Sequence, residues 1–378
     1  MSVYVDISAT VHAKAGLSRY AGSLARALAP VLGPQLRLFQ NSLGTLTPPE
    51  GLAGIPVSGT RLGYRPWRAA VLASRALGLS SRRLAPQCQV FHATEHLLPP
   101  VAAPAVLTVH DLIWELYPQY HRKANYVYLK NAMPLYCRRA ERIVAVSSAT
   151  RADLVERYRI PAEKVTVIAE AAAERFAPAP PSEIERVRSK FSLHGRYIIA
   201  VGTLEPRKNI ATLARACGEL FRRDLADVLV VVGARGWLFE DAMREISALP
   251  WSSRIEMPGY VSDEDLVALY SGAWLAAQPS YYEGFGLPVL EAMACGCPVC
   301  ASETSSLPEV GGDAARYFDP HSLESMTESL ALVAGDDALR NDMRAQGLVR
   351  ADEFSWQRTA HETAALYREL APTIEVLA

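Results

Sequence analysis

The sequence has few cysteines, almost no net charge and no long apolar run. Six cysteines in 378 residues are too sparse for a disulfide framework, so we interpret them as packing thiols in a reducing compartment. Three of them crowd between Cys295 and Cys300, where a zinc site is the alternative. No second Cys or His cluster stands near them in the sequence, so we expect no metal site.

The charges also exclude partners. The 39 Lys and Arg residues balance 40 Asp and Glu to a net charge of −1, so no basic excess indicates nucleic acid. The longest uncharged run, residues 266–282, contains Gly272 and Pro279 and is not typical of a membrane span. The N-terminal segment carries Asp6 and no basic stretch before an apolar core, which argues against a signal peptide. We expect a cytoplasmic protein, with peripheral attachment at the inner face of the cell membrane left open.

Two catalytic motifs are missing as well. The chain has no G-x-G-x-x-G segment, which argues against a nicotinamide dehydrogenase. It has no G-x-S-x-G segment either, which argues against a Ser/His/Asp hydrolase.

What the sequence does contain is an alternation of short β-branched runs with helical patterns, which is typical of parallel α/β sheets. The pattern restarts in the second half, so we predict two Rossmann-like, doubly wound domains that face each other across a cleft. The expected strands are residues 3–7, 90–92, 105–109, 143–146, 197–201, 228–232, 254–257, 274–277 and 299–301.

The prolines of residues 176–181 forbid a continuing helix and predict a linker. We therefore place one domain at residues 1–177 and a second at residues 178–365. The first has 21 Lys and Arg against 11 Asp and Glu, and the remainder has 18 against 29, so the two halves are expected to meet different ligands. Ligands of such sheets bind beyond the carboxyl ends of the strands, which makes the cleft the expected site.

The densest candidate site is PSYYEGFGLPVLEAM, residues 279–293. A glycine loop leads into a helix with Pro288 in its first turn, and such a helix start offers free N–H groups to a phosphate. Glu283 and Glu291 are then suited to accept hydrogen bonds from two parts of one polyhydroxylated ligand. The alternative is a capping acid at Glu283 and a solvated Glu291.

A second candidate is GTLEPRKN, residues 202–209, which follows the expected strand 197–201. Arg207 and Lys208 stand at the carboxyl end of that strand and before a helix, where they are suited to clamp a diphosphate. The alternative makes them surface charges. Cations have the unfavourable sign at a helix start, which favours a bound anion.

Two more candidates lie in the first half. His110 directly follows the expected strand 105–109 and faces the predicted cleft, with a satisfied core histidine as the alternative. Gly16 lies in a loop between the first strand and the first helix, where glycine lets the backbone approach a ligand closely.

Residues 61–83 carry six arginines and no acid. A helix with Pro66 in its first turn puts Arg68 and Arg75 on one face and Trp67 on the adjoining one. Attraction to an anionic membrane surface, with Trp67 at the interface, is one interpretation. The others are a solvated helix packed on the sheet and a patch that meets a phosphate-bearing acceptor.

Taken together, the motifs resemble the retaining glycosyltransferases of family 4, the glycosyl transferases group 1, which have the GT-B fold. The resemblance covers nearly the whole chain and rests on PSYYEGFGLPVLEAMACGCPV, GTLEPRKN, VVGARGWLFE, RIEMPGYVSDEDL, VHD and GLSRY. It implies that the first domain binds the acceptor and the second the nucleotide-sugar donor. It also implies a C-terminal helix, residues 366–378, that crosses back to the first domain.

By this resemblance the candidate residues acquire roles. Glu283 contacts the transferred sugar, Glu291 the nucleotide ribose, and His110 lies near the transferred sugar. Arg207 and Lys208 neutralise the leaving diphosphate. The family also implies that Tyr260 and Val261 flank the base of the donor. The full set of implied donor contacts is Gly16, Thr203, Tyr260, Val261, Gly284, Phe285, Gly286 and Leu287.

The family generally uses no divalent metal and no cofactor, so cations and helix N–H groups stabilise the departing diphosphate. It retains the anomeric configuration, and a front-face ion-pair route without a covalent glycosyl-enzyme at Glu283 is the usual proposal. The sequence departs from many relatives at Thr203, where they have arginine. It also departs at residues 167–171, which read VIAEA where many carry Asn-Gly. Neither departure removes a motif that the chemistry needs.

The stretch GARGWLFE, residues 233–240, looks like versions in mannosyl- and rhamnosyltransferases of bacterial polysaccharide and lipopolysaccharide synthesis. It favours GDP-mannose or a related GDP-sugar, with a UDP-sugar as the alternative. The implied acceptor is a hydroxyl of a glycan or of a lipid-linked diphosphate oligosaccharide. A sugar-nucleotide 2-epimerase shares the architecture and ranks lower. A non-enzymatic assembly scaffold ranks lower too, because it would be expected to have lost Glu283 or Lys208.

Overall fold

The computed structural model describes residues 2–12, 15–44, 46–49 and 51–377. Residues 13 and 14, in the segment before Gly16, and residue 378, at the end of the predicted crossing helix, lie outside the described residues. The described chain forms two compact units. Unit 1 comprises residues of the ranges 2–116, 123–170 and 355–377, and unit 2 those of 117–122 and 171–354.

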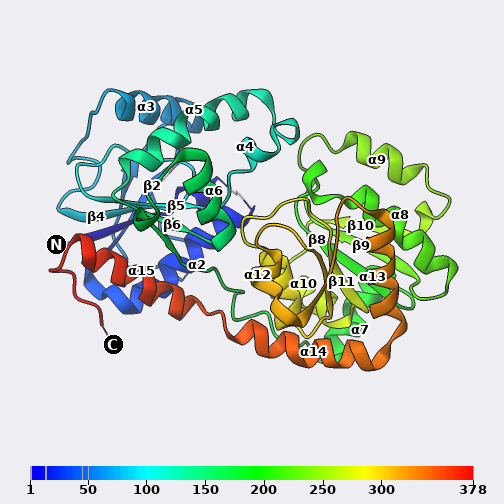
Figure 1. Cartoon of the computed structure of the whole chain (residues 1–378). Coiled ribbons are helices and arrows are strands. Elements are labelled where there is room, and N and C mark those ends of the chain that lie inside the picture. Colours follow the sequence, from blue (N-terminus) through cyan, green and yellow to red (C-terminus); the bar gives the residue numbers. More distant parts are fainter. Residues whose placement is uncertain (1, 13–14, 45, 50, 378) are drawn as a thin grey trace. The chain divides into compact units, whose positions relative to one another are not determined.

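Unit 1 is built on a parallel sheet, whose seven strands within the described residues run in the order β3-β2-β1-β4-β5-β6-β7 (Figure 1). The strands are β1 Ser2–Asp6, β2 Leu36–Asn41, β3 Val57–Thr60, β4 Cys88–Ala93, β5 Ala105–Val109, β6 Arg142–Ala145 and β7 Val165–Val167. Its helices are α1 Ser8–Val11, α2 Ala15–Leu32, α3 Tyr64–Ala76, α4 Ile113–Leu116, α5 Lys123–Arg139, α6 Ser148–Tyr158 and α15 Trp356–Leu370. Strand β5 is buried along its whole length, as expected for a strand covered on both faces.

Unit 2 has a second parallel sheet, in the order β10-β9-β8-β11-β12-β13. The strands are β8 Tyr197–Val201, β9 Val228–Val232, β10 Ile255–Gly259, β11 Leu275–Gln278, β12 Val299–Ser302 and β13 Ala315–Phe318. Its helices are α7 Pro181–Lys190, α8 Ile210–Arg222, α9 Glu240–Ser247, α10 Asp263–Gly272, α11 Leu287–Ala294, α12 Leu307–Gly311, α13 Leu323–Gly335 and α14 Asp337–Asp352. Helices α8 and α13 lie side by side (Figure 1). They bury leucines such as Leu213 and Leu330 against the sheet.

The predicted α/β fold of two doubly wound domains is confirmed, since both sheets are parallel and, among the described residues, all consecutive strands within each sheet except β2–β3 and β4–β5 are joined through helices. All nine expected strands are present within a residue or two. The structure adds four strands that the sequence pattern did not indicate, namely β2, β3, β7 and β13. The cleft between the two domains stays a prediction.

The units divide the chain differently from the predicted domains, because packing decides where each segment belongs. Residues 171–177 lie in unit 2, where the ring of Phe176 contacts that of Tyr270 with 6.4 Å between centroids. Unit 1 takes the C-terminal segment from residue 355, earlier than the predicted residue 366, because the ring of Trp356 packs on Tyr20 at 5.8 Å.

The third difference is residues 117–122, which come from the first half of the chain but lie in unit 2. The ring of Tyr120 stacks on Tyr281, with 6.0 Å between centroids and 19° between planes. Trp237 donates its indole N–H to the carbonyl of Tyr120 over 2.6 Å. Both partners are distant in sequence, so no local pattern predicts this placement.

Among the described residues, no helix combines the length and the apolar character needed to cross a membrane.

Candidate active site

The candidate site of unit 2 lies at the carboxyl ends of the neighbouring strands β8 and β11. Gly202 follows β8, and Gln278 ends β11. After β9, Gly233 has φ +151°, and a Cβ on it would stand 1.9 Å from the carbonyl oxygen of Gly202. Glycine is therefore required at position 233, and it lets the loops that follow β8 and β9 lie close together.

The carboxylate of Glu283 is the centre of this site. Its Oε1 accepts from the Lys208 ammonium at 2.5 Å, the Gln278 amide at 2.7 Å and the Ser280 hydroxyl at 2.6 Å. Its Oε2 accepts from an Arg207 Nη at 2.9 Å. The sequence assigned Glu283 to the sugar and the two cations to the diphosphate, and the structure joins all three side chains in one buried network.

The loop that carries Glu283 is fixed through its backbone. The Glu283 N–H donates to the Ser305 hydroxyl at 2.9 Å. The Ser306 hydroxyl is within hydrogen-bond distance of the carbonyls of Glu283 and Phe285, and Arg207 also donates to the Tyr282 carbonyl at 2.6 Å. The carboxylate is therefore held in place before any ligand binds.

Electrostatics keep Glu283 ionised. Burial alone would raise the pKa of its carboxyl, but Arg207 and Lys208, together with hydrogen bonds from Lys208 and Ser280, outweigh burial and lower that pKa. The pKa of the Lys208 ammonium is lowered too, because burial outweighs the attraction of Glu283, and for a cation this shift disfavours the charged form. The Glu283 carboxylate, which faces both Arg207 and Lys208, is therefore the group whose charged form is stabilised.

Helix α11 begins directly after this loop. Gly286 caps it with φ +111°, and a Cβ there would lie 2.8 Å from the side chain of Leu307. Pro288 stands in the first turn, as predicted. Glu291 lies in the second turn and is 3% exposed. The alternative of a capping Glu283 with a solvated Glu291 is therefore wrong.

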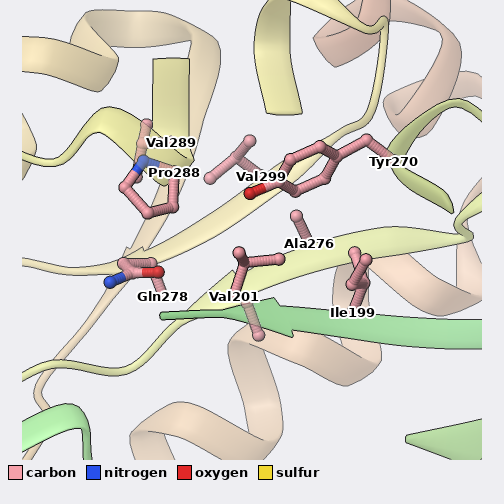
Figure 2. A pocket seen from close by; sticks show the side chains of 9 residues that line it. Ile199, Val201, Tyr270, Ala276, Gln278, Pro288, Val289 and Val299 are labelled. Carbon is pink, nitrogen blue, oxygen red and sulfur yellow. The ribbon is translucent and has the colours of Figure 1, made fainter. Parts of the chain in front are cut away.

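Two small cavities flank Gln278. One, of about 10 Å³, is the size of a single water molecule. Figure 2 shows the ring of Tyr270, Pro288 and the apolar side chains around it, which are Ile199, Val201, Ala276, Val289 and Val299. The other, of the same volume, lies beside Lys208 and Gly202. Neither has room for a sugar nucleotide, so neither is the donor site.

The remaining predicted donor residues of unit 2 lie near strand ends. Thr203 follows Gly202 after β8. Tyr260 follows β10 and is 75% exposed, whereas Val261 beside it is buried. Gly284 is buried in the loop before α11 and Leu287 begins that helix.

In unit 1, Gly16 lies in the first turn of α2, not in a loop as predicted. A Cβ on it would meet nothing within 4 Å. His110 directly follows β5 and is buried. Its Nδ1 lies 3.0 Å from a carboxylate oxygen of Glu170, and its Nε2 lies 3.0 Å from the carbonyl oxygen of Thr94.

The arginine-rich stretch forms α3, which starts two residues before Pro66. Trp67 is buried and stacks on Phe39 at 6.2 Å, so its predicted place at a membrane interface is wrong. Arg75 donates to the carbonyl of Leu98 at 3.0 Å, and Arg68 lies 3.6 Å from the centre of the Tyr128 ring. These two arginines serve the packing of unit 1.

Sequence reasoning missed several residues of both sites. Gln278 and Ser280 share the Glu283 carboxylate, and Glu205 pairs with the second Nη of Arg207. All three stand within five residues of a predicted one, so proximity was their only signal. Glu170 was noted as a departure from the family, but its partner His110 is 60 residues away.

We expect Glu283→Gln to destabilise unit 2 strongly, because it leaves the buried Lys208 without its paired carboxylate and leaves Arg207 paired with Glu205. A broken buried pair of this kind costs about 3–5 kcal/mol. Urea unfolding measures the change. The matched control is Glu256→Gln, which removes an exposed acid from β10 in the same unit and should stay within about 0.5 kcal/mol.

The same pair of proteins tests the pKa. The folded pKa of Glu283 is lowered, so its contribution is present above the unfolded value of about 4.3 and is lost as the pH falls below it. The stability gap between wild type and Glu283→Gln should therefore narrow below that pH. A gap that is constant from neutral to acid pH would contradict the ionised, paired carboxylate.

Comparison with known proteins gives the family. Residues 181–349 match the profile of Glycosyl transferases group 1, and residues 15–171 match that of Glycosyltransferase Family 4. The chain is 34% identical over 283 residues to O-antigen chain mannosyltransferase B of Escherichia coli, and the aligned residues make up 74% of each of the two chains. It is 33% identical over 230 residues to the serotype-specific mannosyltransferase WbdA of Escherichia coli, covering 59% of this chain and 28% of that longer relative.

Solved structures share the fold over almost the whole length. Sucrose-phosphate synthase of Thermosynechococcus elongatus has a TM-score of 0.76 at 19% identity and covers 98% of this chain and 99% of its own. Alr3699/HepE of Anabaena in complex with UDP and glucose has a TM-score of 0.74 at 17% identity, with coverages of 97% and 99%. The chain therefore belongs to glycosyltransferase family 4, the glycosyl transferases group 1, and is a glycosyltransferase with the GT-B fold.

Proposed function

We propose that this glycosyltransferase moves mannose, or a related sugar, from a GDP-sugar to a hydroxyl of a glycan or lipid-linked acceptor, with retention of configuration. The observation that carries the proposal is the buried Glu283 carboxylate between Arg207 and Lys208 at the carboxyl ends of β8 and β11. The names of the Escherichia coli relatives, which are mannosyltransferases of O-antigen and serotype-specific chains, support mannose and bacterial polysaccharide synthesis.

The two cations supply what a departing nucleoside diphosphate needs. Negative charge develops on the bridging oxygen as the bond from the sugar C1 breaks, and fixed positive groups stabilise it without reorganisation. Arg207 and Lys208 are held in place by Glu283 and by the Tyr282 carbonyl. The first N–H groups of α11 add a second set of donors. We propose that these groups do the work that a divalent metal does elsewhere, so the reaction needs no metal and no cofactor.

Glu283 is poorly suited to attack the sugar. Its two oxygens already accept four hydrogen bonds, and its lowered pKa marks a stabilised, weakly nucleophilic carboxylate. This supports a front-face route in which the acceptor oxygen bonds to C1 on the side that the diphosphate leaves. The acceptor proton then passes to the leaving phosphate. Glu283 orients the sugar hydroxyls in this scheme, and Glu291 binds the ribose.

A UDP-sugar donor is the second candidate. The structural neighbour from Anabaena was solved with UDP and glucose, and the two proteins share their fold. The exposed Tyr260 and the buried Val261 are the residues that we place beside the base, and their side chains do not distinguish guanine from uracil. A 2-epimerase would bind the same donor without an acceptor.

Nucleotide binding tests the donor site. We expect one of GDP, UDP, ADP and dTDP, with GDP favoured, to raise the melting temperature of the chain. A ligand at 100 times its Kd stabilises the folded state by about 2.7 kcal/mol. Lys208→Ala and Glu291→Ala should weaken the shift, whereas Arg223→Ala, an exposed site on the same unit, should not. No shift with any nucleotide at millimolar concentration would contradict the proposal.

The reaction itself tests retention and metal independence. We expect transfer from GDP-mannose to give an α-linked product, read from the anomeric proton and carbon in NMR spectra. The rate should be unchanged by EDTA, because cationic side chains serve the leaving group. Intact-mass measurement during turnover should detect no glycosyl adduct on the protein. A β-linked product would contradict retention, and a rate abolished by EDTA would contradict metal independence. A trapped adduct on Glu283 would contradict the front-face route.

We also propose that the protein is cytoplasmic and makes peripheral contact with an anionic membrane. We infer this contact from the exposed apolar and basic side chains before and at the start of α3 and in the segment that follows it. Leu77 and Leu79 are 74% and 58% exposed. The exposed residues also include Arg61, Leu62, Arg65, Arg82 and Arg83. Exposed leucines among cations are typical of a surface that meets lipid headgroups.

Vesicle sedimentation tests this contact. The protein should bind vesicles of phosphatidylcholine with phosphatidylglycerol at low salt and bind phosphatidylcholine alone less well, because the arginines attract anionic headgroups. High salt should weaken the binding. Arg82→Ala combined with Arg83→Ala should reduce it, whereas Arg223→Ala should not. Equal binding to both kinds of vesicle would contradict the electrostatic contact.

A further inference from the structure

The ring of His110 meets an acceptor at each of its two nitrogens. Nδ1 lies 3.0 Å from a carboxylate oxygen of Glu170, and Nε2 lies 3.0 Å from the carbonyl oxygen of Thr94. A carbonyl and an ionised carboxylate only accept hydrogen bonds, and a neutral imidazole has a single N–H to donate. Both contacts are satisfied together when both nitrogens carry hydrogen, that is, in the imidazolium form.

Hydrogen bonds from other parts of unit 1 hold His110, Glu170 and Thr94 in place. The hydroxyl of Thr359 on α15 donates to the carbonyl of Ala169, next to Glu170, over 2.8 Å. The hydroxyl of Thr150 donates to the carbonyl of His110 at 3.1 Å. The hydroxyl of Thr94 donates to the carbonyl of Asp6 at 2.5 Å. The side chains of His110 and Glu170 are 11% and 5% exposed, so little water competes for their hydrogen bonds.

The other titratable groups near the ring include Tyr20, His92, His96 and Asp111. Tyr20 packs edge-on at 4.6 Å and His96 edge-on at 6.1 Å. Burial raises the pKa of Tyr20, which keeps its hydroxyl neutral. Burial, with the His110 charge, lowers the pKa of His92 to about 3, so His92 adds no like charge. The Asp111 carboxylate favours the imidazolium.

The pKa of His110 follows from these contacts. Burial acts to lower it, but the hydrogen bond and charge of Glu170, the Thr94 carbonyl and Asp111 outweigh burial, so the pKa is raised above its usual 6.5. A raised histidine pKa means that the charged form persists to higher pH and is lost as the pH rises through the raised value.

We propose that Glu170 is a positioning residue that holds His110 as a buried imidazolium with both N–H groups engaged, so that His110 acts in glycosyl transfer as a fixed charge and not as a base. The charge state depends on unit 1 alone. The effect on transfer rests on the proposed function. No ring nitrogen is left to take a proton from an acceptor hydroxyl, which agrees with a route in which the leaving phosphate takes it.

The charge state is tested by NMR on the full chain with 15N-labelled histidine. Two-bond 1H–15N spectra separate protonated from bare ring nitrogens, and His110→Gln identifies the His110 signals by their loss. We expect both nitrogens of His110 to be protonated at pH 7.5 in the wild type. A bare nitrogen at that pH, as when a neutral His110 accepts from a protonated Glu170, overturns the proposal. This readout needs neither a substrate nor an active enzyme.

The role of Glu170 is tested by Glu170→Gln, which keeps the size of the side chain and removes its charge. We expect His110 to lose its proton at a pH at least one unit lower than in the wild type, a tenfold change in proton affinity. Glu170→Asp should restore the raised value, and it serves as the readout if Glu170→Gln does not fold. Glu156→Gln, an exposed acid on α6, should change nothing. An unshifted titration in Glu170→Gln overturns the proposal.

Transfer kinetics complete the test. The alkaline limb of the kcat profile should move to lower pH in Glu170→Gln, while the donor KM stays within twofold, because all of the proposed donor contacts except Gly16 and His110 lie in unit 2. If the alkaline limb lies at the same pH in the wild type and in Glu170→Gln, the proposed role of the His110 charge in transfer is overturned. If no donor supports transfer but the NMR shows the imidazolium, the proposed function fails and the charge assignment stands.

Discussion

A carboxylate that is buried must be paired with positive charge, and this requirement organises the loops at the carboxyl edge of the unit 2 sheet. Glu283 is 7% exposed, and a lone ion at that depth would carry a large desolvation penalty. Lys208 reaches it past Gly202, where a Cβ would come within 3.1 Å of the lysine side chain. Arg207 reaches it from the same short turn. The glycines, the serines and the short turn after β8 all serve to assemble this one ion pair network.

Unit 1 also contains a buried ion pair, in which a buried cation is paired with a carboxylate. The end of β5 brings the cation, His110, and the segment after β7 brings the carboxylate of Glu170. Parallel strands end at one edge, so residues distant in sequence meet there without long loops. In both units the pair is fixed by backbone carbonyls and hydroxyls in addition to its own attraction. Fixed charges of this kind can act on a reaction without rearranging.

The sequence predicted the parts of the fold that have a strong local pattern. Strands β8 and β9 match their predicted limits because they are continuous apolar runs, rich in Val and Ile, with four of their five residues buried. Strands β3 and β13 have half-buried residues and edge positions, so their patterns are weak. The candidate residues of the site were predicted from motifs. Their partners were not, because Glu170 and His110 meet through tertiary contacts that no local pattern records.

The places where the chain passes between the two units explain why the domain limits were hard to predict. The prolines of residues 176–181 indicated a linker, yet the chain passes from unit 1 to unit 2 earlier, between Glu170 and Ala171. The residue that pairs with His110 is thus the last residue of unit 1 on that passage. The carbonyl of Ala169, the residue before it, accepts a hydrogen bond from the Thr359 hydroxyl on α15, and α15 is the segment by which the chain returns to unit 1. The contact of α15 with Ala169 thus directly precedes the residue that pairs with His110, so the hydrogen bond that anchors α15 also holds the backbone beside Glu170.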